Sequence, residues 1–585
     1  MATTDETKAE PGASPPGPGQ SGAARALKRY GPIALVIILL GGAFLLFGGG
    51  GGDDEEDTAP ATDRDTSQDE LILSGPMTPQ KAELEGVDVD FGPNCDTETG
   101  RIMLITVYAP PCVEPFEGDN GGATSQGVTA DEILIVDYNA DPALDPLIAA
   151  TAEQAGADVD PETAEAVLQE FVDLYNEIFE TYGRTVRLET YTGTGAGTDV
   201  AAAQADAIAI SEMEPFAVIG GPAQALGVFS AELAENRIIC GPGCANTLPE
   251  DIIEEYEPFL WPTGPTPNQA VALAAEMIGN LAGPGPAEMS GTPEMQAQDR
   301  VYGLLHYDNA DGDHVPVMES FRASLTENEI EIAADVEFTL DLARAQENAR
   351  TNIGQLMDAG VTTIIYYGDP LTPASLTAEA TAQGYYPEWI LGPNVLMDTT
   401  LFARQTDVDQ WKNGFGMALI GARGERSTNG AFQIYEWAFG REPQNNTVNV
   451  FEPQLRTMLN GIHLAGPDLN PETFRDSMLR YPISGGGPTE VQVSRGNHGV
   501  WDEFDWGGSD DMALIWFDPE VAGEDETGNE GVGMYRYANG GQRYTIGNLP
   551  ASVDEAGLFD VENSVTVYDE VPEEDTTPDY EPPDV

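Results

Sequence analysis

The chain has 585 residues, with 100 Asp or Glu against 25 Lys or Arg, which gives a formal net charge of -75 at pH 7. Such a charge repels the phosphate backbone and excludes nonspecific nucleic-acid binding as the main function, so we expect no nucleic-acid partner. The length leaves room for about two or three domains with an ample hydrophobic core.

The N-terminal region predicts a membrane anchor. Residues 1–30 are rich in Pro, Gly, Ala and Ser, which predicts a disordered cytoplasmic N-terminus. The uncharged segment Gly31–Gly48 reaches about 27 Å as a helix, enough to span a hydrocarbon core. Cations at 25–29 precede it and the acidic run 53–57 follows it, so the positive-inside rule places the rest of the chain outside the cell. A cleaved secretory signal is the alternative, but the apolar run ends without a small-residue cleavage site.

The next two segments read as a flexible acidic stalk, residues 49–86, and a small preface, residues 87–128. The four cysteines fall in two local pairs, one in the preface and one further on. In a reducing compartment they would be free thiols or metal ligands, but the pairs lie far apart and have no nearby His, which disfavours zinc. Outside the membrane the spacing predicts the disulfides Cys95–Cys112 and Cys240–Cys244.

The first α/β region begins after the preface. Buried strands are predicted at 132–137, 185–191, 216–221 and 237–240, and helices at 161–182, 200–210 and 223–235. The helix at 161–182 is the strongest in the chain, because its apolar residues recur at helical spacing on one stripe. Alternating strands and helices predict a parallel sheet covered by helices on both faces.

A second region repeats this pattern. Strands are predicted at 301–306, 334–338, 361–367 and 388–391, and helices at 317–328, 342–359 and 375–383. The fold class is therefore α/β, with two doubly wound parallel-sheet lobes. Ligands of such sheets bind beyond the carboxyl ends of the strands, which predicts a cleft between the lobes. From residue 551 the chain is rich in Asp, Glu and Pro, which predicts a disordered acidic tail.

The order of these elements resembles the type I periplasmic-binding-protein fold, and more closely the branched-chain amino-acid class of solute-binding proteins of ABC importers. The resemblance covers about residues 129–550. It rests on the strand 132–137, the strand and Gly-Pro turn at 215–222, the strand and loop at 237–249, and the segments 302–312, 364–369, 389–394 and 533–544. In that family the chain crosses between the lobes more than once. The resemblance therefore implies a first lobe of 129–265 plus 414–482 and a second of 266–413 plus 483–550.

The resemblance also implies ligand-binding residues in the loops after the strands. The candidates are Gln224, Ala245 and Asn246 in the first lobe, and Tyr307, Asp308, Asp369 and Asn394 in the second. Family members that bind amino acids hold the ligand carboxylate with Ser or Thr after the Gly-Pro strand, whereas this chain has Ala223-Gln-Ala225 there. The ligand class stays open among amino acids, amides, peptides and other small polar compounds. Asp369 precedes a helix, so it is alternatively a simple helix cap.

Other motifs carry no chemistry. Gly193–Gly197 resembles a phosphate cradle but lacks the Gly-Lys-Ser/Thr ending, so a flexible turn is favoured. Asp308–Asp313 does not match the alternating ligands of a calcium loop. We find no catalytic grouping and expect no metal or cofactor. The sequence predicts a membrane-tethered extracellular receptor that closes on a small polar ligand and delivers it to an ABC permease. The alternative is a surface sensor or structural protein that keeps the fold without transport.

Overall fold

The computed structural model describes residues 66–155, 160–222, 224–308, 314–393, 396–428 and 430–583. The predicted anchor at 31–48, the N-terminus at 1–30 and the first part of the stalk lie outside these residues. Within the described part of the chain, no helix is both long and apolar enough to cross a bilayer.

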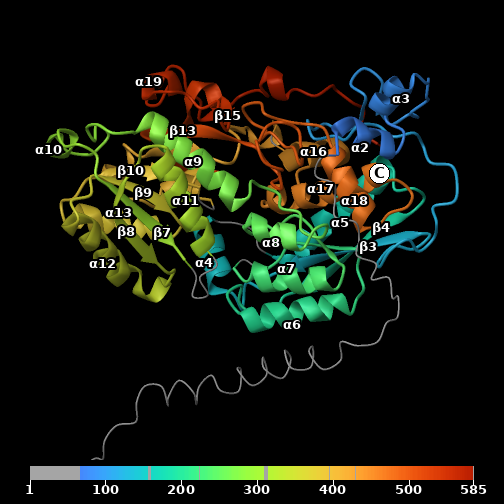
Figure 1. Cartoon of the computed structure of the whole chain (residues 1–585), viewed down its shortest axis with the longest axis horizontal. Coiled ribbons are helices and arrows are strands. Elements are labelled where there is room, and N and C mark those ends of the chain that lie inside the picture. The colour runs from blue at the N-terminus through green and yellow to red at the C-terminus, as the bar shows by residue number, and fades with distance from the viewer. Residues whose placement is uncertain are drawn as a thin grey trace, which may run out of the picture. The chain divides into compact units, whose positions relative to one another are not determined.

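The first sheet has four parallel strands in the order β4-β3-β5-β6. Their bounds are β3 Glu132–Asn139, β4 Thr185–Thr192, β5 Ala217–Ile219 and β6 Ile239–Cys240. Strand β3 is buried almost throughout, because helices cover both faces of the sheet (Figure 1). Tyr138 turns toward α7 (Leu226–Glu235), where it meets Phe229 edge-on at 5.0 Å between ring centroids.

The opposite face of this sheet is covered by α5 (Pro161–Ile178) together with helices from far along the chain. These are α16 Gly430–Phe439, α17 Val448–Ala465 and α18 Pro471–Arg480. Phe171 and Tyr435 pack at 5.6 Å between ring centroids, and Phe216 and Phe474 at 5.9 Å. The four-stranded sheet and its helices form what we call the first lobe.

The second sheet has eight strands, with β14-β13-β11-β10-β9-β7-β8 in order and β15 paired to β13. Strands β7 to β11 run parallel and the last three are antiparallel. The bounds are β7 Tyr302–Tyr307, β8 Ile332–Phe338, β9 Thr363–Tyr367, β10 Glu388–Leu391, β11 Phe415–Ala418, β13 Asp511–Glu524, β14 Glu530–Tyr537 and β15 Arg543–Thr545. We call this sheet and its helices the second lobe.

Two separate apolar layers cover the faces of the second sheet. Leu304 joins the layer under α9 (Pro267–Leu281) and α11 (Val315–Glu327). The next residue, Leu305, joins the layer under α12 (Ala345–Asp358) and α13 (Thr372–Ala382). This alternation is the period-two pattern of a strand buried on both sides, as the sequence predicts.

The remaining elements are α6, α4 and a set of shorter helices and strands. They are α2 Gln68–Ser74, α3 Pro79–Glu85, β1 Cys95–Asp96, β2 Arg101–Ile102, α4 Pro146–Ala155, α6 Val200–Ser211, α8 Glu250–Glu255, α10 Pro293–Gln296, α14 Thr400–Ala403, α15 Val408–Trp411, β12 Arg423–Gly424, α19 Val553–Ala556 and β16 Val567–Tyr568, with 3-10 turns at Leu342–Arg344, Arg426–Thr428, Ala538–Gly541 and Glu573–Asp575.

Both predicted disulfides are confirmed. Cys95 in β1 and Cys112 further along the preface are joined, with 5.6 Å between their Cα atoms. Cys240 and Cys244 close the turn after β6, with 5.3 Å between Cα atoms. The second bond therefore fixes a loop at the carboxyl end of the first sheet.

One predicted lobe boundary is wrong. We assigned the chain from residue 414 to the first lobe, but β11 lies inside the second sheet, parallel to β10 and antiparallel to β13. Strands β10 and β11 approach closely in this sheet. A Cβ on Gly416 would lie 2.4 Å from the backbone oxygen of Leu391, so the glycine at this position permits the pairing. The chain enters the first lobe only after β11.

The stalk and the tail are also more ordered than predicted. In the part of the stalk that the structure describes, α2 is held to the first lobe by Arg480, whose Nε donates to the carbonyl oxygen of Leu71 at 3.0 Å. In the tail, β16 pairs with β12. Asp575 is buried and accepts hydrogen bonds from the amide and hydroxyl of Thr489, both at 2.7 Å. Acidic composition therefore predicts disorder only where the carboxylates find no hydrogen-bond donors in the folded protein.

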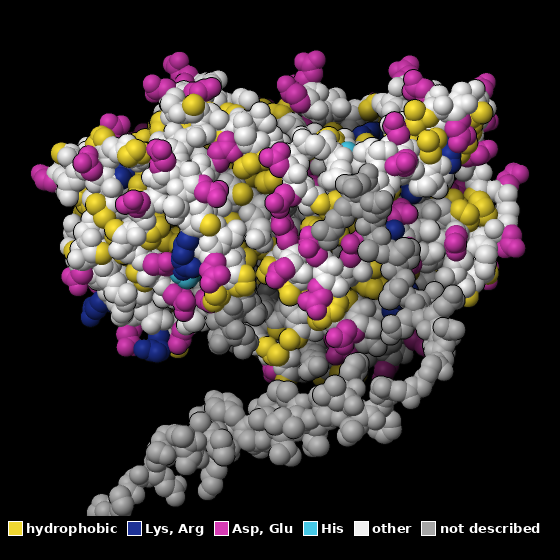
Figure 2. All heavy atoms as spheres, in the orientation of Figure 1, with side chains coloured by type: hydrophobic (Ala, Val, Ile, Leu, Met, Phe, Trp, Pro, Cys, Tyr) yellow, Lys and Arg dark blue, Asp and Glu magenta, His cyan; other side chains and the backbone are white. Residues whose placement is uncertain are grey.

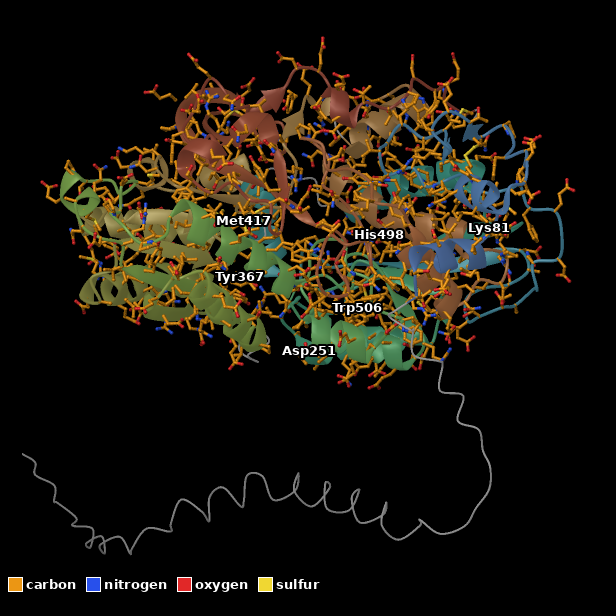
Figure 3. All side chains as sticks on the ribbon, turned by 45° about the horizontal axis from the view of Figure 1, so that its top comes forward. Lys81, Asp251, Tyr367, Met417, His498 and Trp506 are labelled. Carbon is orange, nitrogen blue, oxygen red and sulfur yellow. A yellow bond between two sulfur atoms is a disulfide. The ribbon has the colours of Figure 1, made fainter. Side chains whose placement is uncertain are left out.

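The connections between the lobes contact one another. Residues 256–266 lead from the first lobe to α9, and residues 481–510 lead from α18 to β13. Gln269 donates to Asp505 Oδ1 at 2.6 Å, and Arg495 donates to the carbonyl oxygen of Pro262 at 2.9 Å. Figure 3 labels Trp506, whose ring nitrogen donates to Glu254 at 3.3 Å. These bonds tie the two connections together.

Candidate binding site

The carboxyl end of β3 carries a buried carboxylate. Asp137 is 7% exposed, and its Oδ2 accepts a hydrogen bond from the Asn139 side chain at 2.7 Å. Burial raises the pKa of Asp137 to about 6, against the lowering effect of that hydrogen bond. The sequence pattern does not single out this residue, because it stands at the last position of an apolar strand.

A second carboxylate, Asp206 on α6, organises the loop after β4. It is 1% exposed and accepts from the hydroxyls of Tyr138 at 3.2 Å and Tyr191 at 2.9 Å. It also accepts from the amide of Thr194 at 2.9 Å and from its hydroxyl at 2.6 Å. Burial, with the hydrogen bond to Asp206 next, raises the pKa of Tyr191 to about 12. The carboxylate therefore fixes the strand ends and the loop.

The glycine-rich segment Gly193–Gly197 is part of this packed loop. A Cβ on Gly193 would lie 2.2 Å from the Tyr138 hydroxyl oxygen. The amide of Gly197 donates to Asp145 Oδ2 at 2.6 Å. An amide that faces a carboxylate does not cradle a phosphate, so the geometry favours the predicted turn.

Of the first-lobe candidates, Gln224 is half-buried, and its backbone amide donates to the Gly197 carbonyl oxygen at 3.2 Å. Ala245 is fully buried, which leaves its side chain no access to a ligand. Asn246 Oδ1 accepts from the Thr263 amide at 2.9 Å and so holds the connection between lobes. Gln224, through its backbone amide, and Asn246, through its side chain, thus stabilise the loops.

Gln454 on α17 is a further residue at this edge that the sequence analysis missed. Its Oε1 accepts from the Gly220 amide at 3.1 Å, directly after β5. Gly220 has φ +70°, and a Cβ there would lie 2.4 Å from the Tyr138 carbonyl oxygen, so the turn requires glycine. No signal in the helical pattern distinguishes Gln454 from any other polar residue of a half-exposed face.

The carboxyl end of the second sheet carries aromatic rings. Tyr307 ends β7 and lies edge-on to His314 at 5.3 Å and to Phe338 at 6.1 Å between ring centroids. Tyr367, labelled in Figure 3, ends β9 and lies 6.3 Å from His314. Tyr307, His314 and Tyr367 are each half-buried. We call these four rings the aromatic edge.

Asp308 lies within the aromatic edge. It is 4% exposed, and its Oδ1 accepts from the His314 amide at 3.2 Å. Burial, and then the charge of Asp308, raise the pKa of Tyr367. Tyr307, Asp308 and the end of β9 lie at the same edge because β7 and β9 are neighbours in the sheet, and their role in ligand binding stays a prediction.

Asp369 is committed to α13. Its Oδ1 accepts from the amides of Leu371 and Thr372, each at 2.8 Å, and its Oδ2 accepts from the Thr372 hydroxyl at 2.6 Å. Burial raises the pKa of Asp369, and these hydrogen bonds oppose the rise. This arrangement is a helix cap, the alternative interpretation of the sequence. Asn394, the last candidate, lies outside the described residues.

Asp398 takes a similar structural position beyond β10 and was not predicted. It is 5% exposed and accepts from the amides of Leu419 at 2.9 Å and Ile420 at 3.4 Å, directly after β11. Burial raises its pKa to about 6. It holds the start of the connection that returns to the first lobe.

Both edges are rich in carboxylates, and Figure 2 shows Asp and Glu side chains spread over the visible face with few Lys or Arg among them. Among the described residues, no three His, Cys, Asp or Glu side chains converge as a metal site. The chemistry at these strand ends is hydrogen-bond acceptance and aromatic contact.

Comparison with known proteins gives matches of fold alone. No family model and no curated protein matches the chain. Solved structures similar to it include an ABC transporter substrate-binding protein from Aeropyrum pernix, with 12% identity, 73% of this chain and 98% of that chain covered, and a TM-score of 0.48. A fatty acid ABC transporter substrate-binding protein from Thermomonospora curvata has 12% identity, covers 74% and 97%, and has a TM-score of 0.47.

A third structure is the leucine-, isoleucine-, valine-, threonine- and alanine-binding protein from Brucella ovis, with 11% identity, 72% and 97% covered, and a TM-score of 0.45. These neighbours are periplasmic and substrate-binding proteins, the class that the sequence pattern resembles. A likeness at this level carries no argument about the ligand.

Proposed function

We propose that the chain is a solute-binding receptor that takes a small molecule between its two lobes. The observation that carries this proposal is that polar or aromatic side chains gather at the carboxyl ends of two parallel-stranded sheets. The chain passes between these sheets more than once, at 256–266, 419–428 and 481–510. Strand ends of this kind are where open α/β sheets bind ligands.

The two edges favour a ligand with hydrogen-bond donors and an apolar part. Asp137 and the side chain of Gln224 offer acceptors from the first lobe, while Tyr307 and Tyr367 offer ring faces from the second. The carboxylates disfavour an anionic ligand, because they would repel it at short range. An amino acid, whose ammonium group donates hydrogen bonds, or an amide fits this environment.

Delivery to an ABC permease and tethering by the segment Gly31–Gly48 belong to the same proposal. A lobe closure that buries the ligand would present one closed surface to the permease. The tether would keep the receptor on the outer face of the membrane, close to that partner.

A thermal-shift screen tests the proposal directly. Amino acids, amides, short peptides and polyols are added to the purified chain, and a ligand raises the unfolding temperature by mass action, RT ln(1 + [L]/Kd). We expect a donor-bearing small molecule to raise it, and Tyr307→Ala to reduce the rise. If no compound of any class shifts the unfolding temperature, the binding role fails. The alternative role, a surface sensor or structural protein, would then be favoured.

A further inference from the structure

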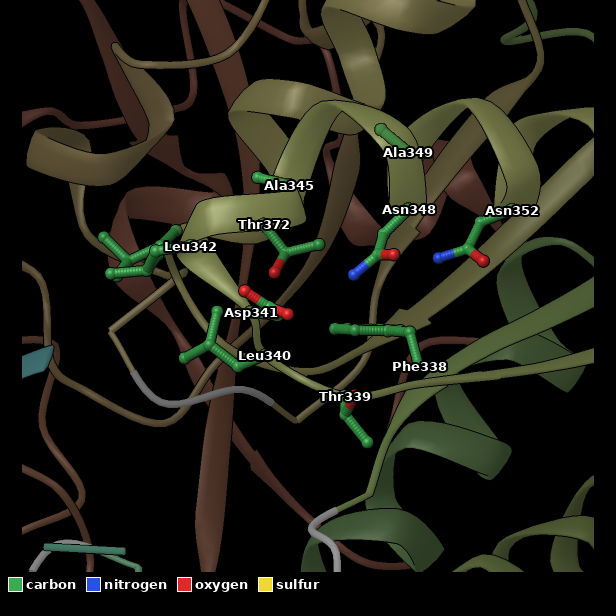
Figure 4. Close-up of a pocket in the computed structure, with 11 residues that line it drawn as sticks. Phe338, Thr339, Leu340, Asp341, Leu342, Ala345, Asn348, Ala349, Asn352 and Thr372 are labelled. Carbon is green, nitrogen blue, oxygen red and sulfur yellow. The ribbon is translucent and has the colours of Figure 1, made fainter. Parts of the chain in front are cut away.

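A hollow opens on the second lobe beside α12, at the carboxyl end of β8. Its volume is about 330 Å³, which includes the space open to solvent at its mouth. The first turns of α12, the loop after β8 and the start of α13 surround it (Figure 4). Because most of this volume is open to solvent, the hollow is a shallow recess that can contact one end of a small molecule and cannot enclose a large ligand.

Two asparagines of α12 line the hollow one helical turn apart. Asn352 is 6% exposed, and none of the described protein groups forms a hydrogen bond with its side chain. Asn348, four residues earlier, is half-buried and equally without a hydrogen-bonded protein partner among these residues. Figure 4 shows both amide groups projecting from the helix toward the space beside Phe338. Because both amides face the open hollow and form no side-chain hydrogen bond with the described protein groups, they are accessible to a group from outside the chain.

Two other polar groups of the hollow already have partners, while the hydroxyl of the exposed Thr339 forms no side-chain hydrogen bond with the described residues. Asp341 Oδ1 accepts from the amides of Ala343 at 3.0 Å and Arg344 at 3.2 Å. The Thr372 hydroxyl donates to Asp369 at 2.6 Å. The remaining wall is apolar, with Phe338 at 6% and Leu371 at 7% exposed. The two asparagines are thus the side-chain amides of the lining with unused hydrogen-bonding capacity.

We propose that this hollow binds a small neutral carboxamide, with its amide on Asn348 and Asn352 and its apolar part against Phe338 and Leu371. A side-chain amide presents a donor and an acceptor side by side, and a second carboxamide is their complement. A carboxylate ligand would find no Lys or Arg in the lining and would meet the charge of Asp341. An alkylammonium ion has no acceptor for the asparagine N–H groups.

The test uses the full chain and three probes of one shape: isobutyramide, isobutyrate and isobutylamine. Saturation-transfer NMR reports which probe binds, and titration gives the Kd. We expect isobutyramide to bind at least tenfold more tightly than either charged probe. Asn352→Leu should weaken isobutyramide at least tenfold, and Asn348→Ala, at a half-buried position, provides a second variant that keeps the core intact. Gln355→Ala on the exposed face of the same helix is the matched control and should change the Kd less than twofold.

A crystal soaked with isobutyramide locates the bound molecule. Density for water alone between the two asparagines, equal binding of isobutyrate, or an unchanged Kd in both asparagine variants would overturn the proposal. This site does not depend on the receptor function proposed above. Tyr367→Ala, which removes a ring on the α11 side of the sheet, should leave isobutyramide binding at the hollow unchanged, so failure of one proposal is distinguishable from failure of the other.

Discussion

The two sheet edges use their polar residues in different ways. At the edge of the first lobe, Asp206 accepts hydrogen bonds from two tyrosines and from Thr194, while Asp137 accepts one from the Asn139 side chain and no other side-chain bond among the described residues. At the edge of the second lobe, Asp369 forms a local cap, and aromatic rings occupy the remaining strand ends.

This difference separates residues that build the site from residues that are open to a ligand. A carboxylate with several short donors has little capacity left for another molecule, so Asp206 and Asp369 maintain the loops. Asp137 and the half-exposed rings of Tyr307 and Tyr367 retain capacity. The first edge therefore supplies polar recognition, and the second supplies apolar contact.

Asp206→Ala should have the largest effect on stability. The substitution leaves two tyrosine hydroxyls and the amide and hydroxyl of Thr194 without their buried acceptor. We expect a loss of about 3–5 kcal/mol, because several hydrogen bonds to a charged group disappear together. Denaturant unfolding followed by circular dichroism measures it. Asp199→Ala on the same helix removes only an N-cap and should cost about 1 kcal/mol. Equal losses in the two variants would contradict the central role of Asp206.

Asp137→Asn should change how stability depends on pH. The folded-state pKa of about 6 lies above the ordinary value of 3.8, so the folded chain binds more protons and loses stability as pH rises from about 4 to about 6. The variant cannot ionise and keeps the acceptor for Asn139. At pH 8 it should be more stable than the wild type by about 3 kcal/mol, and the difference should vanish below about pH 4.

Unfolding curves across this pH range check the prediction. Asp131→Asn, an exposed residue just before β3, is the control and should show no such pH-dependent gain. A constant difference between wild type and Asp137→Asn at all pH values would mean that the charge of Asp137 is not the cause.

Tyr307→Ala tests the aromatic half of the comparison. If the second edge supplies apolar contact, loss of the ring should weaken a ligand found in the thermal-shift screen about tenfold, or ~1.4 kcal/mol. Tyr307→Phe keeps the ring and should bind within about twofold of the wild type. Titration calorimetry provides both values. A Phe variant as weak as the Ala variant would show that the hydroxyl, and not the ring face, binds the ligand.

The central strands of both lobes could be predicted because their residues are buried on both faces. Thr363–Tyr367 is β-branched and aromatic throughout, a composition that suits few other environments. The disulfides followed from short spacing. The lobe of β11 could not be predicted, because its neighbours depend on β13, about a hundred residues later. The sequence of a short apolar strand does not indicate which strand it pairs with.

The site was harder to predict for a related reason. Asp206 occupies a helical position that usually faces solvent, and Gln454 looks like any polar residue of a half-exposed helix. Their roles come from tyrosines and a glycine turn brought near by folding. The strand ends predicted the location of the site. Which of its side chains already form hydrogen bonds within the protein could be learned only from the structure.

Asp369→Ala should have the smallest effect of the series, and it decides whether the second edge contributes a carboxylate to binding. Its side chain holds the amides of Leu371 and Thr372 at the start of α13, so removal should cost about 1 kcal/mol of stability, the usual value of a helix cap. Because both carboxylate oxygens are engaged, we expect ligand affinity to change less than twofold. Asp199→Ala, the cap of α6 in the first lobe, should show a similar loss. The contrary result is specific: unchanged stability with a ligand Kd raised tenfold or more would place Asp369 among the binding residues. The two edges would then both recognise polar groups, and the division between them would be lost.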